Sequence, residues 1–118
     1  MRNKVIDETL RPWGRYHILS DNKSYKIKRI EINLKGRISY QYHLERSETW
    51  VIIKGKGIVT IEGKNKNVVK GDTIVIPKKS KHRIENTGKD KLVLIEVQTG
   101  TYFGEDDIVR LEDDYNRK

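Results

Sequence analysis

Cysteine is absent from this chain, and its 118 residues include only two prolines and one methionine. Without cysteine the protein can form neither a disulfide framework nor a thiolate metal site, so any metal ion would need nitrogen and oxygen ligands. Imidazole and carboxylate ligands suit zinc, iron, manganese, nickel or cobalt.

Long hydrophobic runs are also missing. No window approaches the roughly 20 apolar residues that span a bilayer, and the opening MRNKVIDETL lacks the apolar core of a signal peptide. We therefore expect a cytoplasmic protein with no membrane partner. The length and a hydrophobic content of 35% predict a single domain over residues 1–118, with a polar N-terminal arm at 1–10 and a C-terminal tail at 100–118.

The net charge of +8 would suit an anionic partner, either nucleic acid or a small phosphorylated or acidic ligand. The 25 lysines and arginines are, however, spread along the chain and mixed with 17 acidic residues. The sequence has no basic arm, helix-turn-helix pattern or RNA-binding aromatic signature. We therefore expect no nucleic-acid partner.

Short segments of alternating apolar and polar residues, separated by glycine and asparagine, predict an all-β protein. Within the segment 25–33, a phase change near Arg29 and Ile30 predicts a β-bulge. Residues 63–67 are expected to form a turn, and the tail could form a short strand or a turn of helix. Strands that recur every 8 to 12 residues or so, with no long 3.6-residue period between them, are typical of a sandwich or barrel. The expected strands are 15–19, 25–33, 37–43, 48–54, 58–62, 73–77, 82–85 and 92–98.

Four potential metal ligands lie on or beside these strands: Gln41, His43, Glu48 and His82. Because alternate side chains of a strand share a face, Gln41 and His43 can reach the same ion. Each residue also has an ordinary interpretation. The Gln41 amide could form a hydrogen bond with a backbone group, and His82 alone could be a core or surface histidine. Taken together, the four predict one coordination sphere. His17 lacks such neighbours and is interpreted as structural. Trp50 is interpreted first as a core residue and second as an aromatic wall beside the metal.

The spacing of these residues resembles the two signature motifs of the cupin superfamily, Gln41-x-His43-x4-Glu48-x6-Gly55 and Gly71-x5-Pro77-x4-His82-x3-Asn86. The resemblance implies one double-stranded β-helix, or jelly-roll barrel, with a metal at its centre. Four blocks between Arg11 and Tyr115 are further similar to type II mannose-6-phosphate isomerases. These blocks are RPWGRY, GRISYQYHLERSETWVIIKGKG, IPKKSKHRIEN and LIEVQTGTYFGEDDIVRLEDDY.

The second resemblance implies a metal-dependent isomerase that interconverts mannose 6-phosphate and fructose 6-phosphate. Its cofactor would be one divalent ion, with zinc favoured and manganese, cobalt, nickel or iron as alternatives. Arg46 matches the arginine that the family uses for catalysis, and Glu96 is a candidate general base. Arg83 and Arg110 are candidates for the substrate phosphate, because guanidinium groups bind phosphate bidentately; surface ion pairs are their alternative.

Enzymes of that family usually carry a guanylyltransferase domain with a glycine-rich nucleotide loop, and no such loop occurs in this sequence. The expectation is therefore a free-standing isomerase domain. Two alternatives stay open: a non-catalytic cupin that binds a metal or sugar, and a cupin dioxygenase with a redox metal. An exposed edge strand also makes a homodimer an expectation.

Overall fold

The structure, a computed structural model, describes residues 7–117. These residues form eleven strands and no helix, which confirms the all-β prediction. The strands are β1 (Asp7–Arg11), β2 (Gly14–Asp21), β3 (Tyr25–Ile32), β4 (Tyr40–Tyr42), β5 (Arg46–Lys54), β6 (Lys56–Ile61), β7 (Lys64–Val69), β8 (Thr73–Ile76), β9 (His82–Asn86), β10 (Leu92–Gly100) and β11 (Val109–Glu112). The described part of the chain therefore offers no helix long and apolar enough to cross a membrane.

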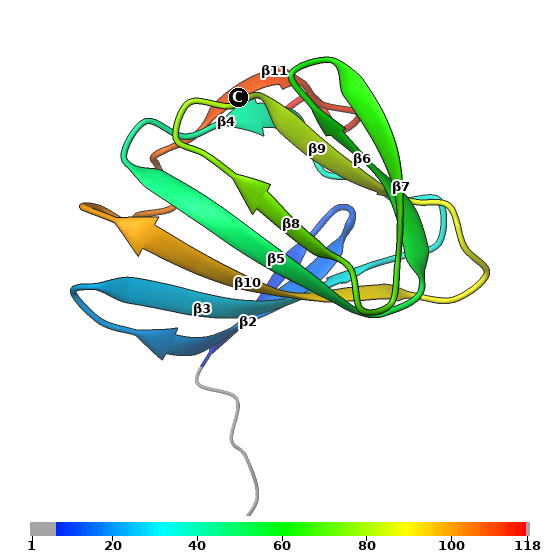
Figure 1. Cartoon of the computed structure of the whole chain (residues 1–118), viewed down its shortest axis with the longest axis horizontal. Coiled ribbons are helices and arrows are strands. Elements are labelled where there is room, and N and C mark those ends of the chain that lie inside the picture. Colours follow the sequence, from blue (N-terminus) through cyan, green and yellow to red (C-terminus); the bar gives the residue numbers. More distant parts are fainter. Residues whose placement is uncertain (1–6, 118) are drawn as a thin grey trace, which may run out of the picture.

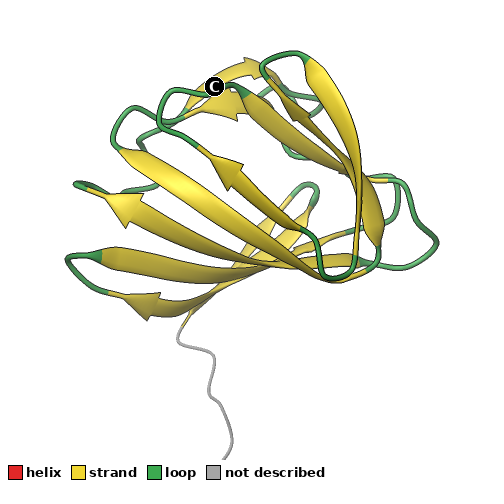
Figure 2. Ribbon diagram, viewed as in Figure 1, coloured by secondary structure: helices red, strands yellow, loops and turns green. Residues whose placement is uncertain are grey.

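The strands make two antiparallel sheets that face each other (Figures 1 and 2). Sheet A has the order β1-β2-β3-β10-β5-β8, and sheet B has the order β11-β4-β9-β6-β7. The late strand β10 lies between the early strands β3 and β5, so sheet A joins segments that are far apart in the sequence. Side chains from the inner faces of both sheets fill the space between them.

The interior is apolar at one end of the strands and polar at the other. Register places Ile32 opposite Leu92, and Leu94 opposite both Ile30 and Ile52, so these rows form the apolar end. Full burial of each such aliphatic side chain contributes about 2 kcal/mol. Further along the same inward-facing positions come five buried polar residues, Lys26, Lys28, Glu48, Glu96 and Gln98. The fold therefore gathers polar groups at one end of a closed core.

The bulge expected near Arg29 and Ile30 is wrong. Strand β3 pairs with β10 without interruption from Tyr25 to Ile32, and the irregularity falls in β2, between Ile18 and Ser20.

The apparent phase change in β3 arises because Lys26 and Lys28 point inward beside Ile30 and Ile32. Both lysines are buried, and both ammonium groups reach Glu105, Lys28 at 2.5 Å and Lys26 at 3.4 Å. A buried ammonium group needs such a partner, because an unpaired charge in a core is strongly unfavourable.

The turn expected at 63–67 is also wrong. The chain reverses at Glu62 and Gly63, whose φ angles are 49° and 80°, and then forms β7. Strand β7 lies at the edge of sheet B, and five of its six residues are exposed. Polar and charged side chains suit an edge strand because they discourage pairing with other chains, but they hide the strand from a search for alternating hydrophobicity.

Each end of the described chain adds a strand to a sheet: the N-terminal strand was not expected, and the C-terminal one is the short strand that was one of the two expectations for the tail. Strand β1 pairs with β2 along its whole length, so residues 7–10 belong to sheet A and not to a surface arm; the rest of the expected arm, 1–6, lies outside the described residues. In the tail, β11 pairs with β4 and extends sheet B.

Candidate metal centre

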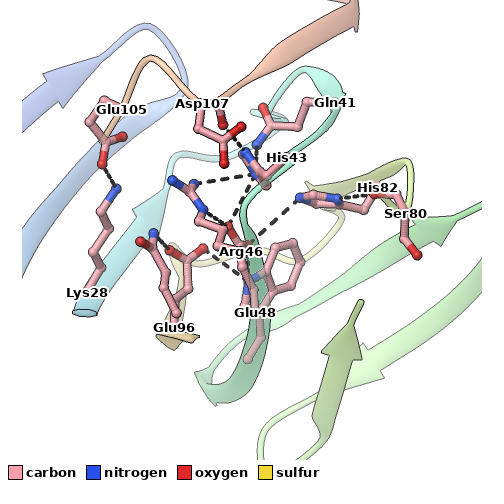
Figure 3. A network of polar contacts seen from close by, with 12 residues as sticks. Lys28, Gln41, His43, Arg46, Glu48, Ser80, His82, Glu96, Glu105 and Asp107 are labelled. Atoms are coloured by element: carbon pink, nitrogen blue, oxygen red, sulfur yellow. Dashed lines mark hydrogen bonds and ion pairs between the residues drawn. The ribbon is translucent and has the colours of Figure 1, made fainter. Parts of the chain in front are cut away.

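The four expected ligands meet at the polar end of the interior (Figure 3). Glu48 comes from β5 of sheet A, while Gln41 on β4 and His82 at the start of β9 are paired residues of sheet B. The candidate ligand atoms of His43, Glu48 and His82 all lie within 4.8 Å of one another, and all three side chains are buried. The closest pair joins His43 Nε2 to a Glu48 carboxylate oxygen at 3.2 Å, and His82 Nε2 lies 3.8 Å from the other oxygen. This cluster could hold a metal ion.

Both histidines present the same ring nitrogen to the centre. Nδ1 of His43 lies 2.6 Å from the carbonyl oxygen of Asp107, and Nδ1 of His82 lies 2.9 Å from that of Ser80. Because a carbonyl oxygen only accepts, each Nδ1 must donate a proton, which leaves the lone pair of Nε2 directed toward Glu48. His82 Nε2 is buried and has no hydrogen-bond partner among residues 7–117. A metal ion would supply the partner that this nitrogen lacks.

The protonation states also fit a metal. Burial and the charge of Arg46 lower the pKa of His43 to about 4, against a weaker opposing effect of its bond to Asp107. His43 is therefore neutral at pH 7, as a ligand must be. Burial alone would raise the pKa of Glu48, but the charge of Arg46 and the hydrogen bonds of the carboxylate lower it overall. Glu48 is therefore a carboxylate.

Gln41 lies beside the centre with its amide nitrogen inward. Its Nε2 is 3.4 Å from His43 Nε2, and its oxygen accepts a 2.6 Å hydrogen bond from the Ser39 hydroxyl. To offer oxygen to a metal, the amide must rotate by half a turn, and the Ser39 hydroxyl can bond either end of the amide. The structure thus brings Gln41 to the centre, and its ligand role stays a prediction.

The expected strands 37–43 and 48–54 left Arg46 in a loop, but the structure places it on a strand. It is the first residue of β5, is 5% exposed, and donates from Nε to Glu48 at 2.9 Å. Its Nη2 also lies 3.4 Å from His43 Nε2. Truncation of Arg46 should therefore destabilise the fold, because it would leave the Glu48 charge buried with less compensation.

A second buried carboxylate, Glu96, lies across from Trp50 in the β10–β5 pairing. The Trp50 indole N–H lies within hydrogen-bonding distance of both Glu48, at 3.0 Å, and Glu96, at 3.1 Å, and the Gln98 amide donates to Glu96 at 2.6 Å. Burial, followed by the negative charge of Glu48, raises the pKa of Glu96 to about 7. Trp50 is thus a core residue that also links the two carboxylates, and Glu96 can gain or lose a proton near neutral pH.

The acidic GEDD segment has two separate tasks that the sequence did not reveal. Glu105 pairs with the buried lysines of β3. Asp107 accepts hydrogen bonds from the backbone N–H groups of Leu44 and Glu45, both at 2.9 Å, while its carbonyl holds His43. Asp107 therefore fixes the loop and the ring orientation of a candidate ligand.

A pocket beside the centre is rich in positive charge. Gln41 and Arg46, which both approach His43, line it together with Trp50 and Glu96. The lining includes five basic side chains and two acidic ones; they are Arg11, Lys28, Arg46, Arg110 and Arg117, with Glu96 and Glu105. A wall of this composition favours an anionic ligand.

Of the two arginines predicted to bind phosphate, the structure brings only Arg110 to this pocket, where its backbone pairs with Gln41. Arg83 alternates with the inward-facing His82 and so points to the other face of β9. There it donates to the carbonyl oxygens of Ile38, at 2.9 Å, and Glu112, at 3.2 Å. The structure therefore does not bring Arg83 to the pocket, and its contacts tie β11 to the rest of sheet B.

Three other basic residues of the pocket, Arg11, Lys28 and Arg117, were missed by the sequence analysis. Lys28 carried a usable signal, because it interrupts the apolar positions of β3. The sequence around Arg11 and Arg117 gives no such signal, because both lie in terminal segments whose positions depend on the folded structure.

Comparison with known proteins agrees with this architecture. The model of the family described as mannose-6-phosphate isomerase C-terminal matches residues 2–113. The fold resembles that of the cupin domain of Schizosaccharomyces pombe Cnp3, with a TM-score of 0.70 at 14% identity over 80% of this chain and 70% of that one. It also resembles the oxalate decarboxylase of Lactobacillus farciminis, with a TM-score of 0.77 at 20% identity over 89% of this chain and 33% of that one. These likenesses confirm the predicted cupin fold.

The curated relatives correct the predicted function. A protein of Salmonella montevideo named mannose-1-phosphate guanylyltransferase is 44% identical over 110 residues, which are 93% of this chain but 23% of that protein. Other curated relatives carry the same name, and the chain again spans about a quarter of their length. The predicted free-standing isomerase of mannose 6-phosphate and fructose 6-phosphate is therefore wrong: the relatives are guanylyltransferases in which this region is one part.

The metal-ligand spacing, the barrel and these sequence matches agree with one another, and this chain therefore belongs to the mannose-6-phosphate isomerase C-terminal family of cupin domains, a family of sugar-phosphate enzymes.

Proposed function

We propose that the polar end of this barrel binds a divalent metal ion and a sugar phosphate, and that Glu96 moves a proton on the bound sugar. The observation that carries the proposal is the pair of buried carboxylates, Glu48 and Glu96, which both lie within hydrogen-bonding distance of the Trp50 indole N–H but whose pKa values are shifted in opposite directions. Two nearby titratable groups with diverging pKa values are typical of sites in which one group stays ionised and the other transfers a proton. Here Glu48 would stay ionised and Glu96 would transfer the proton.

His43, Glu48 and His82 would hold the ion, with Gln41 as a fourth ligand after its amide rotates. Two imidazoles and a carboxylate suit zinc first, and manganese, cobalt, nickel or iron as alternatives. When bound, such an ion acts as a Lewis acid that polarises an oxygen of the sugar.

The remaining chemistry belongs to the protein's own side chains. Glu96, with a pKa of about 7, can take a proton from carbon or oxygen and return it without a large energetic cost. Arg46 lines the pocket and can stabilise negative charge that develops on the sugar. The Trp50 and Gln98 N–H groups keep the Glu96 carboxyl group oriented.

A phosphorylated sugar is the substrate class that best fits the pocket and the relatives. The basic lining favours an anion, and the relatives are named for mannose 1-phosphate. We infer that the site serves the same sugar-phosphate metabolism as the guanylyltransferases, with a cytoplasmic location and with neither nucleic acid nor membrane as partner.

Solvent deuterium exchange tests the acid–base role. Metal-loaded protein in D2O should incorporate deuterium next to the carbonyl of one member of a panel of hexose 6-phosphates, as read by NMR. Glu96→Gln should slow incorporation at least 100-fold or so while metal content stays equal. Glu85→Gln, on the outward side of β9, is the matched control and should exchange at the wild-type rate. Full exchange by the Glu96 variant, or by protein stripped of metal, would refute the proposal.

A further inference from the structure

We infer that the outer face of sheet A binds the same face of a second copy of this chain, so that two barrels pack back to back. The surface involved, here called the outer patch, lies on the neighbouring strands β3, β10, β5 and β8. The sequence suggested a homodimer joined at an exposed edge strand, but the outer patch would join the two copies through a sheet face. Its side chains point away from sheet B, and they are Ile27, Thr49, Val51, Val75, Ile95 and Val97.

The register of sheet A makes the outer patch continuous. In one row across the sheet the directly opposed residues are, in order, Val75, Thr49, Val97 and Ile27. In the next row Val51 lies opposite Ile95. The Cβ atoms of opposed residues in adjacent strands are about 5 Å apart, so their methyl groups touch. The patch is therefore one apolar surface and not a set of separate exposed side chains.

Nothing in the described part of the chain covers the outer patch. All eleven described strands belong to the two sheets, and sheet B packs against the inner face of sheet A, the side of Glu48 and Glu96. Figure 1 shows no described strand over the opposite side of β3, β10 and β5. The side chains there are half-buried, and Val75 is 62% exposed. An uncovered apolar surface that spans four strands marks an interaction site.

The sequence of the central strands also has the pattern of a sheet that is buried on both faces. Antiparallel strands with one face in water usually alternate apolar and polar residues. Strand β5 instead contains the run WVII, and β10 contains the run LVLI. In sheet B, by contrast, the outward residues of β9 are Arg83 and Glu85. The outer face of sheet A is thus built for burial, and the outer face of sheet B is not.

The balance of charge favours a second copy as the occupant. A net charge of +8 opposes the association of two copies wherever their charges meet. The outer patch is uncharged, and the charged residues beside it pair with one another: Arg15 and Arg29 contact Glu31, and Arg15 also contacts Glu8. Two copies can therefore meet at this face without bringing unbalanced like charges together. An acidic partner would be attracted to the exposed lysines of β7 instead.

The shape and size of the face also suit a second copy. Two sheets that pack face to face lie about 10 Å apart, and their side chains interdigitate. Sheet A has six strands, and its central strands are eight or nine residues long, so its face has a projected area on the order of 600 Å². The accessible area of such a face exceeds its projected area. A standard interface buries roughly 800 Å² on each partner, so the face is large enough for a specific dimer.

Sedimentation equilibrium of the full chain tests the inference. We expect twice the chain mass of 13.9 kDa at micromolar concentrations. Added sodium chloride should strengthen the association, because it screens the repulsion between two positively charged chains and leaves apolar packing intact. A monomer throughout the micromolar range, or a dimer that salt dissociates, would overturn the inference.

Ile95→Lys and Ile58→Lys form a matched pair of variants. Ile95 faces outward on β10 in sheet A, Ile58 faces outward on β6 in sheet B, and both are half-buried on interior strands. Ile95→Lys should weaken the dimer at least about 100-fold, because dimerisation would bury two lysine charges without partners. Ile58→Lys should leave the dimer at wild-type strength. A dimer that survives Ile95→Lys, or equal weakening by both variants, contradicts the outer patch as the interface.

Val97→Thr guards against a folding artefact. Threonine keeps the shape and the strand preference of valine but brings a hydroxyl group into the contact, so the dimer should weaken by about 10-fold while the circular dichroism spectrum stays unchanged. Wild-type affinity in this variant would show that Val97 is not buried between two copies and would refute the inference. Because these measurements need neither metal nor substrate, loss of the inference and loss of the proposed acid–base role are separate results.

Discussion

Two buried carboxylates at the polar end of the barrel differ in the proton that each holds. Glu48 accepts hydrogen bonds from Arg46 and from the Trp50 N–H, so its ionised form is stabilised despite complete burial. Glu96 lies on the neighbouring strand β10, and its ionised form is repelled by the charge of Glu48. Residues of the same type thus acquire different protonation through their neighbours alone.

The raised pKa of Glu96 predicts how stability depends on pH. An exposed glutamate has a pKa of about 4.3. Burial, followed by the negative charge of Glu48, raises the pKa of Glu96 in the folded protein to about 7. Between these values the folded state keeps a proton that the unfolded state has released. The contribution of Glu96 to stability therefore falls as pH rises from about 4.5 to 7 and stays constant above that.

Glu96→Gln should remove this slope in the metal-free protein. The variant is expected to be more stable than wild type at pH 8, by on the order of 1 to 3 kcal/mol, and to gain much less at pH 5. Urea unfolding at both pH values measures the difference. Parallel pH profiles for the two proteins would show that Glu96 titrates like an exposed carboxyl group.

At the scale of elements, the register between β10 and β5 decides where the polar groups meet. It places Glu96 opposite Trp50 and Gln98 opposite Glu48, and it ends with Gly100 opposite Arg46. The close approach of these two strands at Gly100 fixes the position at which the Arg46 side chain enters the interior.

Gly100→Ala should disturb that approach. A Cβ atom on Gly100 would lie 2.2 Å from the carbonyl oxygen of Glu45 and 2.9 Å from the Cα of Arg46, and the φ of +152° is rarely adopted by other residues. The strands would have to separate, so we expect a loss of about 3 kcal/mol in unfolding free energy and a lower metal content.

Gly71→Ala serves as the control for this substitution. Its φ is +95°, but no atom lies within 4 Å of the added Cβ, so only backbone strain applies, at about 1 to 2 kcal/mol. Thermal unfolding of both variants measures the difference. Equal losses would mean that the contact with β5 does not constrain the site.

At the scale of the whole molecule, the candidate metal centre ties the two sheets together. Glu48 belongs to sheet A, His82 belongs to sheet B, and His43 is held by the segment between β10 and β11. An ion bound by all three would cross-link elements that otherwise meet through side-chain packing. Metal should therefore stabilise the entire fold.

Metal removal is expected to lower the melting temperature. At an ion concentration 100 times its dissociation constant, binding adds about 2.7 kcal/mol, which corresponds to about 10 °C for a domain of this size. His82→Ala should abolish the metal-dependent increase. His17→Ala, at a histidine that pairs with Glu8 instead, should retain it even if its baseline stability is lower. Differential scanning calorimetry with and without chelator decides between these results, and an equal increase in both variants would refute the site.

The expected homodimer also belongs to this scale and stays a prediction. Strands β8 and β7 each end a sheet, and Val75 on β8 is 62% exposed. Analytical ultracentrifugation of wild type and Val75→Lys would show whether β8 mediates pairing, because a lysine on an edge strand opposes association.

The sequence by itself determined the fold class and the grouping of the candidate ligands. Alternation and turn spacing predicted an all-β barrel, and the spacing of His43, Glu48 and His82 predicted one cluster, because those residues lie on or directly beside strands that pair nearby or face each other across a thin core. The ligand roles of these residues and the activity of the protein could not follow from spacing alone.

Tertiary structure decided which polar residues point inward. Lys28 and Arg46 look like surface residues because charge normally marks the solvent face, but at the polar end of this barrel that rule is reversed. The partner of Lys28, Glu105, lies 77 residues away, and two arginines of the basic pocket, Arg11 and Arg117, come from terminal segments. No local pattern can encode such contacts, because they form only when the two sheets pack together. A charge that becomes buried there is unfavourable unless it has an opposite charge beside it.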